Sequence, residues 1–384
     1  MKIWNGLAAI FAALLLTSTT FGQAPVKIGG KDVVKLERKA TGDGKRAEFL
    51  SATVLPGRGM NLVQVTAFIP GKGVTNVLYA PPIEEVAKLL NGGADDQFGN
   101  GSFKLGAAFL VPFANLIRGK ASANRKSITA EWEDKQLTLP ANWPEGHPEV
   151  PPSAIHGLIR SDKADSVTLH TVEDGEALVG VIHAGDFGGA WPSKTDLEIT
   201  ITLTGNSVTA SVNAKNVGDQ KEPMGIGWHP YFAIPSGNRK QAKLSLPATK
   251  VGGVNDADDG LPTGKWLEAK HTPRDFNMPG GKALGDIPLD DYFGGLVRKD
   301  GAVVVELTDP AAHYGIRILG PSQEILNMVV YAPADKPFVA AEEQFNVGDP
   351  FGKQWKGQNT GMVTLQPGQS VTWTNQLELF TPKQ

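Results

Sequence analysis

The 384-residue sequence contains no cysteine, so it forms no disulfide bonds and its fold must be held by its core alone. It also lacks a charge imbalance, because 37 Lys and Arg residues stand against 40 Asp and Glu residues and neither sign forms a block. This balance argues against nucleic acid or an anionic membrane as a partner and favours an uncharged one. No internal repeat, low-complexity linker or composition break divides the chain, so we expect residues 23–384 to form a single domain.

No apolar run is long enough to span a bilayer, but a short one lies near the N-terminus at residues 8–16. Lys2 precedes this run and small residues follow it, which is typical of a secretory signal. We therefore expect residues 1–22 to be a signal peptide that is cleaved after Gly22. The mature protein would begin at Gln23 and be periplasmic or secreted, with no stable membrane insertion after cleavage.

Short apolar alternations separated by turn residues dominate the rest of the chain, which has 45 glycines and 27 prolines. The clearest example is residues 196–204, which alternate in polarity, turn at Gly205-Asn206 and are followed by a second alternating run at residues 207–214. This pattern predicts a β-hairpin. Only residues 82–90 carry a helical spacing, with a proline in the first turn. We therefore expect an all-β protein with one or a few short helices.

The most informative segment is residues 225–232, Gly-Ile-Gly-Trp-His-Pro-Tyr-Phe. Pro230 favours an extended backbone at His229, which predicts that the imidazole lies at a strand end and not in a helix. Trp228 and Tyr231 are suited to the walls of a pocket with an apolar face and a polar rim, which is the kind of surface that a sugar presents. His156, between Ile and Gly in another short apolar segment, has a similar local setting. Two such histidines favour a functional role over simple packing.

Carboxylates occur beside apolar residues at two further predicted strand ends. Asp290 and Asp291 precede an aromatic pair, and Glu342 and Glu343 follow a run of small apolar residues. Neighbouring residues of a strand face opposite ways, so the members of each pair are alternatives. The residues alone leave both choices open.

In their order along the chain, these segments resemble the aldose 1-epimerase (galactose mutarotase-like) family. The resemblance runs from residue 50 to residue 379, and its marks are residues 115–119, 155–157, 227–232, 262–264, 289–293, 340–344 and 361–368. It implies a large antiparallel β-sandwich, of the galactose mutarotase-like supersandwich type, that binds a monosaccharide in a groove across one sheet. The implied activity is interconversion of the α and β anomers of a free aldose.

By position, the resemblance makes Glu342 the general base at the anomeric hydroxyl and His229 the general acid at the ring oxygen. The implied substrate-binding residues are His156, Asp290, Arg118, Asn115, Trp228 and Tyr231. Ring opening moves one proton off a hydroxyl and one onto an ether oxygen. An acid and a base on opposite sides of C1 therefore suffice, and no metal or cofactor is needed.

Two departures from the family pattern leave alternatives open. Leu116 stands where the family has arginine, and Arg118, two residues on, would point to the same side of a strand and can replace it. Glu343 adds a second carboxylate beside the expected base. Because of these departures, a non-catalytic carbohydrate-binding module remains a second hypothesis.

A metal site built from His156, His229, Asp290 and Glu342 is a third hypothesis. Arg118 and Arg160 are the only candidates to hold the phosphate of a phosphosugar.

Overall fold

The computed structural model describes residues 26–382 except for residue 43, residues 145–148 and residues 256–259. The expected signal peptide, residues 1–22, lies outside this part of the chain. Among the described residues, no helix is both long and apolar enough to cross a membrane.

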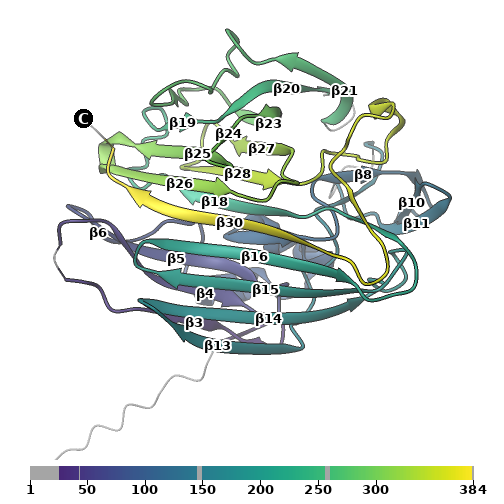
Figure 1. The fold of residues 1–384 in the computed structure, drawn as a ribbon, viewed down its shortest axis with the longest axis horizontal. Helices are drawn as coiled ribbons and strands as arrows, with labels where there is room; N and C mark the ends of the chain where they lie inside the picture. The colour runs from purple at the N-terminus through teal and green to yellow at the C-terminus, as the bar shows by residue number, and fades with distance from the viewer. Residues whose placement is uncertain (1–25, 43, 145–148, 256–259, 383–384) are drawn as a thin grey trace, which may run out of the picture.

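Two large antiparallel sheets make up most of the described structure (Figure 1). The first sheet contains, in spatial order, β13 (Ser166–Val172), β14 (Gly175–Gly185), β15 (Thr195–Thr204), β16 (Ser207–Asn216), β30 (Ser370–Phe380), β26 (Tyr314–Gly320), β25 (Ala302–Asp309), β19 (Lys243–Ser245) and β22 (Lys282–Ala283), with β24 (Arg298–Lys299) paired to β25. The second contains β21 (Leu261–Glu268), β20 (Ala248–Asn255), β23 (Leu289–Leu296), β27 (Asn327–Ala332), β28 (Phe338–Gln344), β18 (Gly227–Ala233), β7 (Ala107–Leu110), β5 (Asn61–Ile69), β4 (Glu48–Leu55) and β3 (Val34–Glu37), with β6 (Gly73–Asn76) paired to β5.

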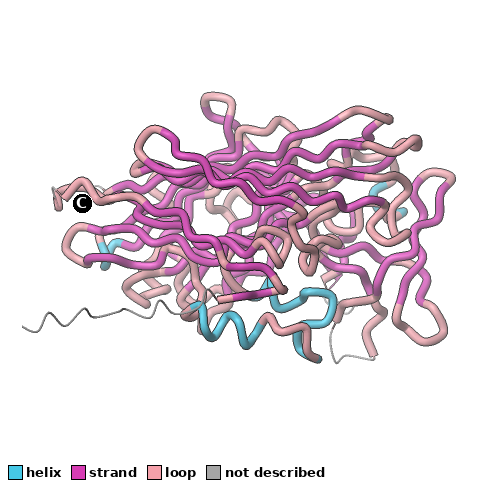
Figure 2. The backbone as a smooth tube through the Cα atoms, turned by 90° about the horizontal axis from the view of Figure 1, so that it is seen from below, coloured by secondary structure: helices cyan, strands magenta, loops and turns pink. Residues whose placement is uncertain are grey.

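Small sheets and helical turns complete the fold, and Figure 2 shows the helical segments at the margin of the layered strands. The small sheets pair β1 (Lys27–Ile28) with β2 (Lys31–Asp32), β9 (Lys120–Ala121) and β11 (Lys135–Pro140) with β10 (Ser127–Trp132), β8 (Leu116–Arg118) with β12 (Ser153–Ile155), and β17 (Glu222–Met224) with β29 (Val363–Leu365). In the described residues, the helical segments are α1 (Ile83–Leu89), η1 (Ala94–Lys104), η3 (Pro310–Ala312) and η4 (Lys353–Trp355).

The predicted fold class, hairpin and helix are confirmed. The hairpin is β15–β16, in which Leu203 pairs with Val208 on either side of the turn, and the helix is α1, which follows Pro82. One expectation was wrong in detail, because His229 lies inside β18 and not at its end. The proline after it fixes an extended backbone without ending the strand.

The two large sheets pack against each other around one hydrophobic core. Trp228 of β18 and Phe109 of β7 both contact Trp373 of β30, with ring centroids 6.0 and 6.3 Å apart. All three side chains are at most 1% exposed. Aromatic pairs at this spacing stabilise a core beyond the area that they bury. The central strands of both sheets are therefore held in place from the inner side of the sandwich.

Replacing Trp373 with alanine is expected to lower the free energy of unfolding by about 3–5 kcal/mol, because the change leaves a cavity between the sheets. It also removes the hydrogen bond that Nε1 donates to the carbonyl oxygen of Glu343. Urea denaturation followed by circular dichroism measures the effect. Leu267→Ala is the control, since that side chain is 59% exposed and its loss should change stability by less than about 0.5 kcal/mol. Equal stabilities of the two variants would contradict the assigned core.

Candidate active site

The outer face of the second sheet carries two neighbouring rows of side chains. Successive strand residues point to opposite faces, so cross-strand partners and residues two apart share this face. The first row runs across β23, β27, β28 and β18 and consists of Tyr292, Val329, Glu342 and His229. The second row crosses the same strands and consists of Asp290, Tyr331, Ala340 and Tyr231. Residues far apart in the sequence thus form one continuous floor.

His229 and Glu342 are in direct contact at the centre of this floor. Nε2 of His229 lies 3.2 Å from Oε1 of Glu342, and both side chains are buried. The register of β18 against β28 explains the contact, because the pairs two residues away on either side are aligned. These pairs are Gly227 with Gln344 and Tyr231 with Ala340. The two groups therefore lie side by side on the floor.

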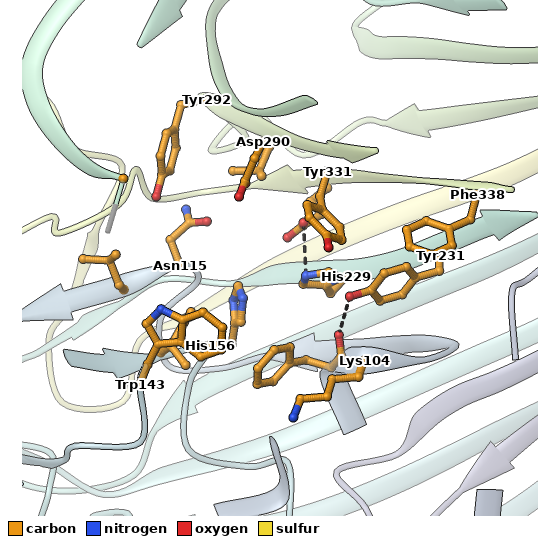
Figure 3. Close-up of a pocket in the computed structure, with 16 residues that line it drawn as sticks. Lys104, Asn115, Trp143, His156, His229, Tyr231, Asp290, Tyr292, Tyr331 and Phe338 are labelled. Carbon is orange, nitrogen blue, oxygen red and sulfur yellow. Dashed lines mark hydrogen bonds and ion pairs between the residues drawn. The ribbon is translucent and has the colours of Figure 1, made fainter. Parts of the chain in front are cut away.

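A cavity of about 500 Å³ lies over the floor (Figure 3). Its size is within the range typical of small-molecule sites. All members of the two rows except Ala340 line it. The remaining lining residues come mainly from loops, short strands and the end of η1, and they are Phe103, Lys104, Asn115, Leu116, Trp143, Ile155, His156, Gly260 and Phe338. Aromatic and aliphatic groups thus surround a small set of convergent polar groups.

Aromatic contacts fix the orientation of the His229 ring. The ring of Tyr231 stacks on it at 4.8 Å, and the hydroxyl of Tyr231 donates a hydrogen bond of 2.8 Å to the carbonyl oxygen of Phe103. The ring of His156 meets that of His229 edge-on at 5.0 Å. His156 follows directly after β12 and has a positive φ of 58°, so it lies in a bend just beyond the end of that strand.

Burial controls the protonation of the contact pair. It lowers the pKa of His229 to about 3, and the positive charge of Arg160 acts in the same direction. Burial likewise raises the pKa of Glu342 well above its usual value, assisted by the charge of Asp290 and opposed by a hydrogen bond from Gln344. Charged forms are disfavoured in low dielectric. The cavity therefore favours a pair that carries one proton, held on the carboxyl group.

The buried side-chain amide of Gln344 is hydrogen-bonded to the carboxyl oxygen of Glu342 that does not contact His229. Nε2 of Gln344 donates to Oε2 of Glu342 at 2.8 Å, and Oε1 of Gln344 accepts from Nδ2 of Asn115 at 2.6 Å. Asn115 has a positive φ of 56°, a backbone conformation that asparagine adopts more readily than most residues. The hydrogen bonds therefore link the expected sugar-binding amide to the carboxyl group of the pair.

The structure separates the alternatives that the sequence left open. Glu342 lines the cavity, whereas the carboxyl group of Glu343 points away and accepts a hydrogen bond of 2.7 Å from Nδ2 of Asn375 in β30. Asp290 also lines the cavity, and Asp291 instead pairs with Arg274 at 2.9 Å. In both cases the alternation of a strand places one carboxyl group on each face of the sheet.

Two expected substrate-binding residues lie outside the cavity. The side chain of Trp228 faces the core between the sheets, because its neighbour His229 occupies the outer face, and its Nε1 donates to the carbonyl oxygen of Ala107. Arg118 donates from Nη1 to the carbonyl oxygen of Pro151, so it does not replace the missing family arginine, and Leu116 lines the cavity without it. The other six expected residues, Asn115, His156, His229, Tyr231, Asp290 and Glu342, are brought together.

The sequence also left open a metal site and a phosphosugar site. In the part of the chain that the structure describes, no group of three or more His, Asp or Glu side chains is placed to hold a metal ion. Neither of the two arginines considered for a phosphosugar, Arg118 and Arg160, lines the cavity.

Sequence reasoning missed several residues of the cavity wall. Phe103 and Lys104 come from the end of η1, which has no regular amphipathic pattern, and Trp143 comes from a proline-rich loop. Tyr331 and Phe338 could have been predicted as cavity residues from the sequence pattern. Both lie in short apolar strands at positions that alternate with core residues.

A family model described as aldose 1-epimerase matches residues 79–378. The uncharacterized protein YphB of Escherichia coli K12 is 27% identical over 135 residues, which cover 31% of this chain and 41% of YphB. A galactose mutarotase-like protein from Clostridium acetobutylicum has a TM-score of 0.70 at 16% identity, over 90% of this chain and 98% of that one. The galactose 1-epimerase of Lactobacillus acidophilus NCFM has a TM-score of 0.62 at 16% identity, over 92% and 99%. These structural matches establish the shared fold.

The buried carboxyl group of Glu343 is expected to make stability depend on pH. Burial raises its pKa to about 8 from an ordinary value of 4.5, so the folded protein binds this proton more tightly than the unfolded chain does. Stability should therefore fall as pH rises from about 4.5 to about 8, by about 1.4 kcal/mol for each unit of the shift. Glu343→Gln should be more stable than the wild type at pH 8, and this gain should shrink as pH falls.

Urea titrations between pH 4.5 and 8.5 measure the difference between variant and wild type. Glu268→Gln is the matched control, because that carboxyl group is exposed and its change should leave the difference near zero throughout. A gain for Glu343→Gln that stays constant across this pH range would refute the assignment of a buried neutral acid.

Proposed function

Because the chain belongs to the aldose 1-epimerase family, we propose that it interconverts the α and β anomers of a free aldohexose by acid–base ring opening. The observation that carries the proposal is the 3.2 Å contact between His229 and Glu342 on the floor of the cavity. The hemiacetal oxygens O1 and O5 are bonded to the same carbon. A side-by-side acid and base can therefore reach both of them at once.

The proton transfers balance without any other reactant. Glu342 removes the proton from the O1 hydroxyl as the C1–O1 bond becomes a carbonyl. The C1–O5 bond breaks, and O5 takes the proton from Nε2 of His229. The open-chain aldehyde then rotates about the C1–C2 bond, and the ring closes by the same steps in reverse to give the other anomer.

The pKa shifts describe how the pair reaches its working form. These shifts favour the shared proton on the carboxyl group of Glu342. Its transfer across the 3.2 Å contact gives a carboxylate beside an imidazolium, which is the arrangement that ring opening uses. The two forms differ only in the position of one proton, so the pair can exchange roles between ring opening and ring closure.

The remaining polar groups are proposed to hold the sugar hydroxyls. Asp290 lies two strands from Glu342 in the neighbouring row, His156 stands beside His229, and Asn115 is fixed through Gln344. The apolar faces of the sugar ring would pack on aromatic walls such as that of Trp143. A non-catalytic sugar-binding module, the alternative suggested by Leu116, would use these same contacts without turnover. A measurement of activity therefore distinguishes the epimerase from the binding module.

Purified protein is expected to accelerate the change in optical rotation of freshly dissolved α-D-glucose or α-D-galactose. Glu342→Gln should lower kcat by about 10²- to 10⁴-fold, because it removes one partner of the proton transfer. Glu343→Gln is the matched control, since that residue faces the other side of the same strand, and it should retain wild-type kcat. If the wild type accelerates no common aldose yet binds one in calorimetry, the protein is a sugar-binding module and the enzymatic proposal fails.

We also propose that the protein is exported to the periplasm or the extracellular space. The support is the basic start, short apolar run and small residues within residues 1–22. On expression of the full chain in a Gram-negative host, we expect the protein in the periplasmic fraction with Gln23 as its N-terminal residue. Edman sequencing tests this directly, and an intact Met1 on protein confined to the cytoplasm would exclude export by this segment.

A further inference from the structure

We propose that Arg160 is a positioning residue that fixes both histidines of the site from behind the cavity wall. The proposal rests on the function proposed above. Arg160 does not line the cavity, and its side chain is among the largest that are almost fully buried, at 2% exposure. A guanidinium group in such a place is costly to bury unless its hydrogen-bonding groups find partners. The partners of Arg160 indicate its role.

The guanidinium group clamps the backbone around His156. Nη1 donates to the carbonyl oxygens of Ile155 and His156, each at 2.7 Å. Nη2 donates to Oδ1 of Asn100 at 2.8 Å. His156 has the positive φ of 58° noted above, a conformation that costs a non-glycine residue free energy. Two hydrogen bonds from the same nitrogen, Nη1, hold this bend, and the bend sets the direction of the His156 ring.

A second route runs through Phe103. The central carbon of the guanidinium group lies 5.0 Å from the centroid of the Phe103 ring, which is a cation–π distance. Three other rings lie next to that of Phe103, with centroids 4.9 Å away for His156, 6.1 Å for His229 and 6.2 Å for Trp143. Arg160 therefore supports the ring of Phe103, and that ring contacts both imidazoles.

The same placement acts on the charge of the imidazoles. Burial is the main reason for the low pKa of His229 and of His156. The charge of His229 lowers the pKa of His156 next, and the positive charge of Arg160 lowers both pKa values further. The groups that face His229 are Glu342 at 3.2 Å and the rings of His156 and Tyr231. Lys104 and Asp290 line the same cavity. A fixed cation behind the wall helps to keep the shared proton of the pair on the carboxyl side.

A lysine could supply the charge but not the clamp. Its ammonium group is a point charge, whereas the planar guanidinium fork reaches two carbonyl oxygens and one amide oxygen at once. Arg160→Lys and Arg160→Met thus separate the two contributions. Lysine keeps the cation and loses the fork, and methionine keeps the approximate length and loses both.

The experiment measures kcat and KM of these two variants by polarimetry and the titration of the imidazoles by NMR. We expect kcat to fall about 10- to 100-fold in Arg160→Met, as for a displaced catalytic group. KM should rise as well, because Arg160 holds the backbone of His156, which is proposed to bind a sugar hydroxyl. In the same variant His156 and His229 should titrate at higher pH than in the wild type. Arg160→Lys should keep the low imidazole pKa values and recover part of kcat.

Arg239→Met is the matched control. Arg239 is 4% exposed and also caps backbone carbonyl oxygens, those of Gly285, Ile287 and Ala332, none of which line the cavity. It should lower stability while leaving kcat and the histidine titrations unchanged. Unfolding curves establish that each variant is folded at the assay temperature. If Arg160→Met does not fold, Arg160→Lys decides alone, and wild-type kcat in that variant overturns the proposal.

Where both variants fold, the proposal is overturned if Arg160→Met keeps the wild-type kcat and its two histidines titrate as in the wild type. The NMR arm does not require turnover. A wild-type protein without activity would therefore remove the proposed function while the titrations still decide whether Arg160 controls the histidines.

Discussion

The register between β18 and β28 is the constraint on which the site depends. It places the imidazole of His229 opposite the carboxyl group of Glu342, although the two residues are far apart in the sequence. Side chains alternate with a period of two, so a slip of one residue would turn either group toward the interior. Packing of Trp228 against Trp373 on the inner side disfavours such a slip. The hydrophobic core thus fixes the geometry of the polar pair.

Periodicity explains why much of this arrangement was predictable. Short alternating segments indicated an all-β fold, and the position of His229 before a proline marked it as extended. Alternation alone also states that only one of Glu342 and Glu343 can face a ligand. It does not state which one, because that depends on which face of the finished sheet is covered by the other sheet.

The wrong predictions have the same cause, because sequence alternation does not show which face of a sheet is covered. Trp228 is next to His229 in sequence but belongs to the opposite face, and Arg118 shares a face with Leu116 but binds the carbonyl oxygen of Pro151. Phe103 reaches the cavity from η1, whose backbone includes non-helical residues and has no periodic pattern. Loop segments that are brought together only by tertiary contacts carry no local signal of their final neighbours.

Because side chains alternate along the central strands, neighbouring residues are selected for different properties, one for ligand binding and the next for core packing. Positions 229 and 231 of β18 and 340 and 342 of β28 form the floor or its support, while positions 228, 232, 339 and 341 fill the interior. Mutations that change sugar preference can therefore accumulate on one face without disturbing the packing on the other. A scaffold with this separation can diversify its ligands while its melting behaviour stays nearly constant.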